Sequence, residues 1–302
     1  MSLDVRIARF SGFCPGVKRA LKLAEKTLAE DGGGGKYTVG PIIHNPLVVE
    51  RLADKGLEVL PEDPAQWYGL DLSESTVILR SHGLGPGSIE ELRRRGARIV
   101  DATCPIVKKA RRSAISLVEE GYHLMIVGSS VHPEVSAIVE HLGGRAVVVV
   151  SNAREVMDWL RNQEEIPRRI GVTAQTTISM QSLQEVVDLL PNYVRDLKVL
   201  NTLCKTTLKR QKEARKLSRK SDLMLVVGGK NSSNTNHLRL ICEGEGTPSY
   251  HVESVREIEP SWFEGVCQVG VVGGASTPED MIDDVIEYVK RLSEEKRWEI
   301  PP

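Results

Sequence analysis

Short apolar runs alternate with stretches in which apolar residues recur every three or four positions. The runs predict β-strands, and the periodic stretches predict amphipathic helices. We expect strands at residues 5–10, 37–40, 77–79, 97–100, 124–128, 169–173, 197–200, 223–228 and 269–272. We expect helices at residues 47–55, 88–95, 179–190 and 278–297, besides those described next. Such alternation is typical of parallel sheets, so we predict an α/β fold with functional loops at the carboxyl ends of strands.

The same arrangement of elements occurs three times. Cys14, Cys104 and Cys204 each stand between a predicted strand and a basic helical pattern, at separations of 90 and 100 residues. After each such helix, two further strands each run into a polar loop. Three units joined in a ring would bring the cysteines and the polar loops to one centre. The predicted units cover residues 13–102, 103–202 and 203–302, and the N-terminal strand within residues 1–12 completes the third.

Composition narrows the class of protein. The 302 residues carry 40 basic and 41 acidic side chains, and only 4% are aromatic. A near-zero net charge and few rings for base stacking argue against a nucleic-acid partner. The N-terminus lacks a signal-peptide pattern and no apolar run could span a bilayer, so we expect a cytoplasmic protein without a membrane partner. Five widely spaced cysteines then favour metal binding or catalysis over disulfides.

Each cysteine of the repeat is expected at a helix N-terminus. Pro15 and Pro105 directly follow their cysteines, in the helix position that tolerates proline best. The helix dipole there favours the thiolate, which is the form that ligates metals. Three such thiolates fit an iron–sulfur cluster with one iron open for substrate, because a cubane has four irons. Two alternatives stay open: a metal-free repeat, and a zinc site, which the lack of a Cys-x-x-Cys motif disfavours.

The polar loops form the second half of the candidate site. His44 and His132 occupy matching positions of the repeat, and His82 shares its position with Thr176 and Ser276. Donors on short side chains near helix N-termini suit a phosphate or diphosphate. The set comprises His44, His82, His132, Ser232, Ser233, Asn234 and Ser276. The alternative, that loop histidines only support the fold, is disfavoured by their recurrence at repeat positions.

Glu134 is the carboxylate within this set. It can donate a proton if burial raises its pKa, and the alternative is an acid that accepts backbone N–H bonds at a helix start. The other cysteines and histidines are assigned no functional role. We expect Cys242 and Cys267 in the core, His123, His237 and His251 at the surface or in local hydrogen bonds, and His141 after a helix.

Eight motifs follow one another along nearly the whole chain. They are Gly12-Phe-Cys-Pro-Gly-Val, His44-Asn-Pro-Leu-Val-Val, Ser81-His-Gly, Asp101-Ala-Thr-Cys-Pro, His132-Pro-Glu-Val, Gln175-Thr-Thr, Lys230-Asn-Ser-Ser-Asn and Gly274-Ala-Ser-x-Pro. In type and order they resemble the motifs of the 4-hydroxy-3-methylbut-2-enyl diphosphate reductase family. Two positions depart from the family pattern: Ala174 replaces a usual threonine, and Val131 replaces a common glycine, which disfavours a positive φ there.

The resemblance implies a trefoil of three α/β domains around a [4Fe-4S] cluster with one open iron, held by Cys14, Cys104 and Cys204. It implies that the diphosphate is bound by His44, His82, His132, Ser232, Ser233, Asn234 and Ser276. Thr176 is then expected near the substrate hydroxyl and Glu134 in the proton path. The implied reaction is the reductive dehydroxylation of 4-hydroxy-3-methylbut-2-enyl diphosphate to isopentenyl and dimethylallyl diphosphate, the last step of the non-mevalonate isoprenoid pathway.

Two other iron–sulfur functions are alternatives to this reductase reaction. A quinolinate synthase-like enzyme also joins three α/β units around a cluster, but the histidine and Ser-Ser-Asn loops disfavour it. An iron–sulfur redox sensor would need a DNA-binding module, and no segment offers one.

Basic residues that follow the three cysteines suggest an electron donor. We hypothesise that they form a rim that docks a small acidic carrier such as ferredoxin or flavodoxin. The alternative is that they are solvated helix faces. The residues are Lys18, Arg19, Lys108, Lys109, Arg111, Arg112, Lys205, Lys209, Arg210 and Lys212.

Overall fold

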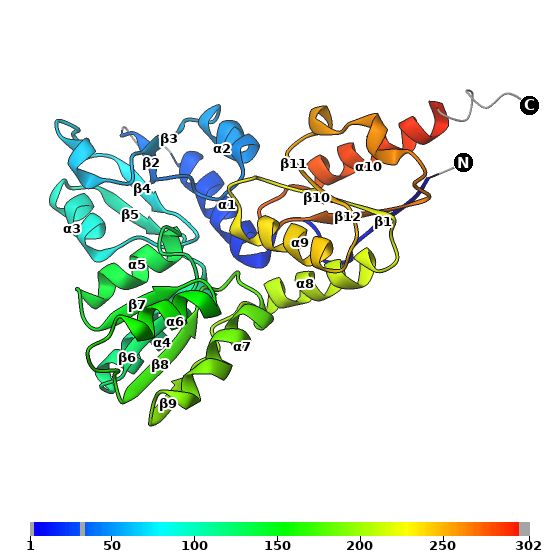
Figure 1. Ribbon diagram of the computed structural model, residues 1–302. Helices are drawn as coiled ribbons and strands as arrows, with labels where there is room; N and C mark the ends of the chain where they lie inside the picture. The colour runs from blue at the N-terminus through cyan, green and yellow to red at the C-terminus, as the bar shows by residue number, and fades with distance from the viewer. Residues whose placement is uncertain (1–2, 31–33, 296–302) are drawn as a thin grey trace, which may run out of the picture. The chain divides into compact units, whose positions relative to one another are not determined.

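The structure, a computed structural model, describes residues 3–30 and 34–295 (Figure 1). It contains three four-stranded sheets with parallel strand pairs and packed helices, which confirms the predicted α/β fold. Each of the nine predicted strands coincides with an observed strand. The predicted continuation of the last helix to residue 297 lies outside the described residues, as do residues 1–2 and 296–302 of the predicted third unit.

The three sheets share one topology. Their strand orders are β3-β2-β4-β5, β7-β6-β8-β9 and β11-β10-β12-β1. The first sheet contains β2 (Lys36–Val39), β3 (Leu57–Leu60), β4 (Thr76–Leu79) and β5 (Arg98–Asp101). The second contains β6 (His123–Val127), β7 (Val147–Val150), β8 (Arg169–Ala174) and β9 (Asp196–Val199). The third contains β1 (Asp4–Ile7), β10 (Leu223–Val227), β11 (Ser249–Val252) and β12 (Gln268–Gly273).

In each sheet the strand that precedes a cysteine lies at one edge, and a strand that the sequence analysis did not predict lies at the other. The unpredicted strands are β3, β7 and β11, each only four residues long. Edge strands are paired on one side only and are therefore often short and partly exposed. In β3 only the two end residues are buried, so its apolar pattern is weak. The run of four valines in β7 is a stronger strand signal, although it was not among the predicted strands.

Ten α-helices connect or follow the strands in the described part of the chain. They are α1 (Pro15–Leu28), α2 (Pro46–Ala53), α3 (Pro86–Arg94), α4 (Pro105–Glu119), α5 (Pro133–Leu142), α6 (Ala153–Arg161), α7 (Met180–Leu189), α8 (Lys205–Ser218), α9 (Ser233–Gly244) and α10 (Glu279–Glu295). Five of them begin at a proline. Proline suits this first position because its ring presets φ and the missing N–H has no helical partner there.

The chain forms two compact units. The first comprises residues 1–15, 44–48 and 205–302 and contains the third sheet. The second comprises residues 16–43 and 49–204 and contains the other two sheets. The predicted division into three ranges places one sheet in each range, and as a division into domains it stays a prediction.

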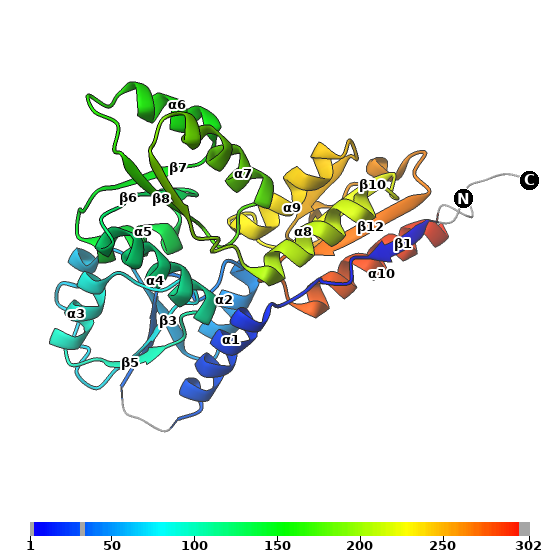
Figure 2. The same ribbon diagram turned by 90° about the horizontal axis from the view of Figure 1, so that it is seen from below.

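The third sheet is covered on both faces (Figure 2). Side chains alternate along β10, so Leu225 faces the helix α10 together with Val285, whereas Met224 and Val226 face α8 and α9 together with Leu238. Such alternation follows from the two-residue period of a strand. Parallel strands buried on both faces read as continuous apolar runs, which is why the sequence predicts β10 well.

Within the second unit, α5 contacts α3 across the boundary between its two sheets. The Glu140 carboxylate on α5 accepts the Gly87 N–H at 2.8 Å, in the first turn of α3. The N-cap of α3 is Gly85, which has no side chain to cap the helix. Glu140 therefore supplies the negative charge that stabilises a helix N-terminus.

None of the helices in the described ranges is both long and apolar enough to cross a membrane.

Candidate functional site

All three repeat cysteines lie at the junction of an edge strand and a helix. The helices α1, α4 and α8 begin immediately after Cys14, Cys104 and Cys204, as the sequence predicts. Each cysteine N–H donates to a carbonyl in the loop after the neighbouring strand, which extends the parallel ladder past the strand end. The acceptors are the carbonyls of Ala275, Ser81 and Thr176, at 2.9, 2.9 and 3.0 Å respectively.

The three cysteines fit a metal cluster by their chemistry. All three are partly exposed, and the side chain of Cys104 makes no capping hydrogen bond with its helix. Three soft sulfur side chains, each placed at the same point of a repeated fold, are the ligand type that iron–sulfur clusters use.

Glu134 and Thr176 form a buried hydrogen-bonded pair in the second unit. Glu134 is the second residue of α5, and only 1% of its surface is exposed. Its carboxylate accepts the Thr176 backbone N–H at 2.8 Å and the Thr176 hydroxyl at 2.6 Å. Burial raises the pKa of Glu134 to about 7, although the two hydrogen bonds from Thr176 act in the opposite direction. The Thr176 carbonyl in turn accepts the Cys204 N–H, so these residues are connected.

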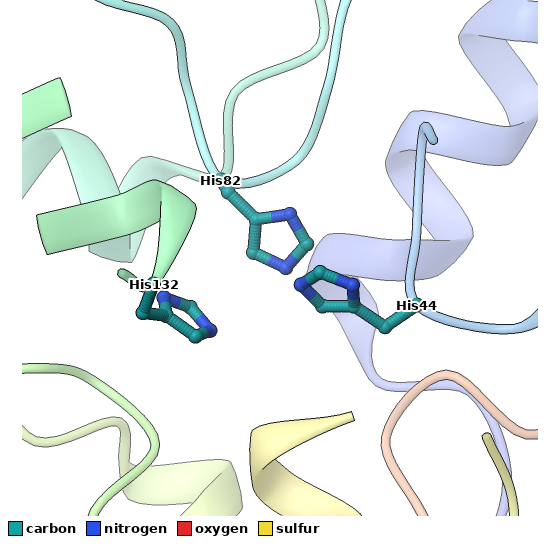
Figure 3. Close-up of side chains that lie close together, drawn as sticks. All are labelled: His44, His82 and His132. Atoms are coloured by element: carbon teal, nitrogen blue, oxygen red, sulfur yellow. The ribbon is translucent and has the colours of Figure 1, made fainter. Parts of the chain in front are cut away.

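His82 and His132 lie next to each other in the same unit (Figure 3). Their ring centroids are 5.5 Å apart, and the rings meet edge to face. His132 is the N-cap of α5, where its Nδ1 accepts the Glu134 N–H at 3.2 Å. This bond makes Nδ1 the acceptor and leaves Nε2 as the N–H donor when the ring is neutral. His82 comes from the loop after β4, whose Ser81 carbonyl holds Cys104.

The other predicted diphosphate ligands belong to the first unit. The Ser276 hydroxyl donates to the carbonyl of His44 at 2.9 Å, which joins the loop after β12 to the segment before α2. Ser232 is the N-cap of α9, and Ser233 begins the helix. Asn234 follows in the first turn with 4% of its surface exposed. Both polar atoms of its side chain are buried without a hydrogen-bond partner in the described part of the chain.

Comparison with known proteins places the chain in a family. The family model of the LytB protein matches residues 5–290. The chain belongs to the LytB family. It is 41% identical over 296 residues to the 4-hydroxy-3-methylbut-2-enyl diphosphate reductase of Geotalea uraniireducens, with 97% of this chain and 99% of that protein covered. It is 40% identical over 295 residues to the enzyme of the same name from Aquifex aeolicus, with 97% and 98% covered.

Two solved structures resemble this LytB chain. One, of an (E)-4-hydroxy-3-methyl-but-2-enyl diphosphate reductase described as the terminal enzyme of the non-mevalonate pathway, is 39% identical. It covers 96% of this chain and 99% of its own, with a TM-score of 0.67. The other, of the E-1-hydroxy-2-methyl-but-2-enyl-4-diphosphate reductase from Plasmodium falciparum, is 24% identical and has a TM-score of 0.86, with 95% and 88% covered. At that identity the second structure supports the fold alone.

The two cysteines of the LytB chain outside the repeat differ from each other. Cys242 is fully buried in the core beside α8, as predicted, and burial raises the pKa of its thiol to about 12. Such a thiol stays protonated and is a poor metal ligand. Cys267 is exposed, so its prediction as a core residue is wrong. It directly precedes β12, and its N–H donates to the Asp222 carboxylate at 2.9 Å.

The remaining histidines have local roles. As predicted, His237 and His251 form hydrogen bonds with backbone carbonyls, to Ser233 at 2.8 Å and to Gly228 at 2.7 Å. His123 is half-buried, with its ring 5.3 Å from that of Trp159. His141 lies in the last turn of α5 rather than after the helix, and its Nε2 is 3.1 Å from Arg111.

Neither departure from the family pattern distorts the backbone. Val131 is 87% exposed, and none of the described non-glycine residues has a positive φ. A valine therefore fits the loop before His132 without strain. The backbone of Ala174 is held by a neighbouring side chain. The Thr202 hydroxyl accepts the Ala174 N–H at 2.8 Å and donates to the Ala174 carbonyl at 2.5 Å.

Gln175 is a site residue to which the sequence analysis assigned no role. It is buried, its Oε1 accepts the Ser129 N–H at 3.0 Å, and its Nε2 donates to the Thr177 hydroxyl at 2.6 Å. It thereby links the loop before His132 to the loop that carries Thr176. Its place in the Gln-Thr-Thr motif was the available signal.

The structure divides the predicted basic rim into exposed and engaged residues. Arg210 is buried, so its assignment to a docking surface is wrong. Lys108 is half-buried and pairs with Asp101 at 2.5 Å. Arg111 is half-buried beside His141, and Arg19 on α1 is exposed but donates to the Thr103 and Asp101 carbonyls. The other residues that stay exposed are Lys18 on α1, Lys109 and Arg112 on α4, and Lys205, Lys209 and Lys212 on α8.

Proposed function

We propose that this LytB protein reduces (E)-4-hydroxy-3-methylbut-2-enyl diphosphate to isopentenyl diphosphate and dimethylallyl diphosphate, as the last step of the non-mevalonate isoprenoid pathway. The names of its relatives and the coverage of the whole chain support this reaction. The observation that carries it is the connected group of Cys204, Thr176 and Glu134. It joins a candidate cluster ligand to a buried acid that is half-protonated near neutral pH.

The reaction breaks the allylic C–O bond and forms one C–H bond. It consumes two electrons and two protons, and the hydroxyl leaves as water. A [4Fe-4S] cluster bound by Cys14, Cys104 and Cys204 would supply the electrons and one open, Lewis-acidic iron for the hydroxyl.

In this proposal Glu134 is the proton source. A carboxyl with a pKa near 7 combines a large protonated fraction with a strong tendency to give up the proton at neutral pH. The Thr176 hydroxyl, 2.6 Å from that carboxyl, orients the carboxyl group and is proposed to contact the substrate hydroxyl. Together the two side chains convert the departing hydroxyl into water.

In this proposal the diphosphate is bound by His44, Ser276 and the N-terminal residues Ser232, Ser233 and Asn234 of α9. The dipole and unpaired N–H groups at a helix start attract anions. A buried amide without a partner is costly, so the Asn234 side chain gains most from a ligand that accepts its N–H. His82 and His132 are the further proposed ligands and supply ring N–H groups.

Ferredoxin or flavodoxin is the proposed electron donor. Among the described residues, the exposed Lys109 and Arg112 follow Cys104 on α4, and Arg19 on α1 reaches the Thr103 carbonyl at 3.3 Å. Positive charge beside a ligating cysteine suits an acidic carrier, because complementary charge accelerates encounter. The cytoplasmic location stays a prediction.

Anaerobic purification followed by iron and sulfide analysis tests the proposal. We expect about four irons and four sulfides per chain, and an electron paramagnetic resonance spectrum that changes on addition of the diphosphate substrate. Reduced methyl viologen should drive formation of both products. Replacement of Cys14, Cys104 or Cys204 by serine should abolish iron retention, whereas the matched changes at Cys242 and Cys267 should not. Full iron content in Cys104→Ser would refute the cluster assignment.

A further inference from the structure

Arg210 is a buried arginine on α8 that binds the chain just before Cys14. Only 3% of its surface is exposed. Its Nη1 donates to the Phe10 carbonyl at 2.6 Å and to the Gly273 carbonyl at 3.2 Å, and its Nη2 donates to the Gly12 carbonyl at 2.5 Å. The planar guanidinium presents its donors in a fixed fork, so one side chain holds three carbonyls in one geometry.

The segment that Arg210 binds is irregular and needs external support. It leaves β1 after Ile7 and reaches Cys14 through Gly12, whose φ of 84° is accessible mainly to glycine. Ser11 is already engaged, because its hydroxyl donates to the Ala8 carbonyl at 2.9 Å and accepts the Gly273 N–H at 3.0 Å. The carbonyls on either side of Ser11 are the ones that Arg210 holds.

The other two cysteine loops each contain an internal support, although Arg19 on α1 also donates to the Thr103 and Asp101 carbonyls of the Cys104 loop, at 3.3 Å each. Asp101, three residues before Cys104, accepts the Thr103 N–H on its carboxylate at 2.9 Å. Asn201, three residues before Cys204, accepts the Leu203 N–H on its amide oxygen at 3.0 Å. Both are Asx turns, in which a side chain replaces a backbone acceptor and stabilises the loop.

The Cys14 loop has Ser11 at the position of these Asx residues, and its hydroxyl bonds elsewhere. The helices that follow the cysteines compensate for this difference. Six residues after Cys14 and Cys104 the helices carry the buried alanines Ala20 and Ala110. At the same distance after Cys204, α8 carries Arg210. The large cationic side chain is thus placed against the one cysteine loop that lacks an Asx turn.

We propose that Arg210 is a positioning residue that holds the Cys14 loop in the conformation in which the thiolate binds the cluster. It acts through the carbonyls of Phe10 and Gly12 and touches neither substrate nor iron. That Cys14 must be held for cluster binding rests on the proposed function, whereas the ordering of the Cys14 loop by Arg210 does not. Experiments can therefore refute the ordering of the loop and the proposed function separately.

The test uses full-length protein purified anaerobically. Arg210→Met removes the guanidinium and keeps an unbranched stem, and Arg210→Lys keeps the charge but not the fork. Arg215→Met is the matched control, because Arg215 is also on α8 but pairs with Glu245 at 2.7 Å near the surface. The readouts are backbone hydrogen exchange by mass spectrometry, the rate of iron release to a chelator, and the spectrum of the reduced cluster.

We expect residues 8–14 to exchange about tenfold faster in Arg210→Met, because each hydrogen bond to a charged donor contributes at least that factor. Exchange in β10, at the centre of the same sheet, should match wild type, as should every readout of Arg215→Met. Iron should be released faster from Arg210→Met and at an intermediate rate from Arg210→Lys. If Arg210→Met does not fold, the same exchange and iron-release measurements on Arg210→Lys test the proposal, with a smaller expected increase in both rates.

Two exchange results would overturn the proposal. One is wild-type exchange at residues 8–14 in both variants. The other is equal acceleration in β10, which would show that Arg210 supports the sheet as a whole. Faster exchange at residues 8–14 with unchanged iron release would refute the link to the cluster. A wild-type protein without iron and sulfide would instead refute the proposed function and leave the exchange comparison intact.

Discussion

Glu134 should determine how turnover depends on pH. Its pKa of about 7 means that the carboxyl is about nine-tenths protonated at pH 6 and about one-tenth at pH 8. If the protonated form is the proton donor, the rate should fall by nearly tenfold between these values. Glu134→Gln cannot donate a proton, so its rate should be about 10²–10⁴ lower and independent of pH in this range.

Variants of Thr176 test independently whether Glu134 is the group whose titration sets the pH profile. Its hydroxyl donates to the carboxylate at 2.6 Å, which favours the charged form and lowers the pKa. Thr176→Val should therefore move the alkaline limb of the profile to higher pH, and Thr176→Ser, which keeps a hydroxyl, should leave it in place.

The assay is pre-steady-state turnover with saturating substrate and excess reduced methyl viologen, which supplies both electrons, since slow product release or slow electron supply would otherwise mask the proton step. A Glu134→Gln protein that keeps the wild-type alkaline limb would show that another group titrates. A normal rate in that variant would remove Glu134 from the mechanism.

The same pKa predicts a stability change of definite sign. A carboxyl whose pKa rises from 4.5 to about 7 on folding stabilises the protein below pH 4.5, and this stability is lost as the pH rises through 7. The shift corresponds to roughly 3 kcal/mol. Denaturant unfolding should show the stability of wild type falling by that order relative to Glu134→Gln between pH 4.5 and 8. A constant difference would contradict the raised pKa.

Three further predictions concern other parts of the molecule. Asn234→Ala should raise KM for the diphosphate without lowering the melting temperature of the substrate-free protein, since the wild-type amide is buried without a partner; a lower melting temperature would contradict this. Gly85→Ala puts a methyl group onto the Glu140 carboxylate, so its cost of about 1 kcal/mol should be smaller in a Glu140→Ala background, where only the poorer N-cap remains; additive costs in denaturant unfolding would exclude the contact. Charge reversal at Lys109 and Arg112 should slow ferredoxin-driven turnover but not turnover with methyl viologen, and equal loss with both donors would exclude docking.

Much of the fold could be predicted from the sequence because the buried strands are continuous apolar runs. In β10 and β12 both faces pack against helices, so the run Leu223–Val227 has no polar position that could obscure it. The edge strands β1, β5 and β9 are equally exposed but were predicted because each runs into a cysteine of the repeat, whereas β3 and β11, at the opposite edges, precede no such motif. Proline after two of the cysteines located helix starts, since only a first helical turn accommodates it readily.

The candidate site was predictable in its residue types but not in its contacts. Repetition of cysteine, strand and loop singled out the ligands, because three equivalent folding units place equivalent residues at equivalent strand ends. That Glu134 is buried against Thr176 follows from the pairing of α5 with the loop after β8, which brings together residues 42 positions apart. No local pattern specifies such a contact, and the raised pKa depends on it.

The burial of Arg210 could not be predicted from the sequence. In the sequence it is one of several basic residues on a helix, and charge alone assigns it to solvent. The tertiary structure places it beneath the loop before Cys14, almost 200 residues earlier, where three carbonyls replace water as acceptors. The sequence determined which elements form, because the spacing of apolar residues and the residues that start helices are local properties of the chain. Only the packed structure decided which buried polar groups meet, because their partners come from distant segments that tertiary packing brings together.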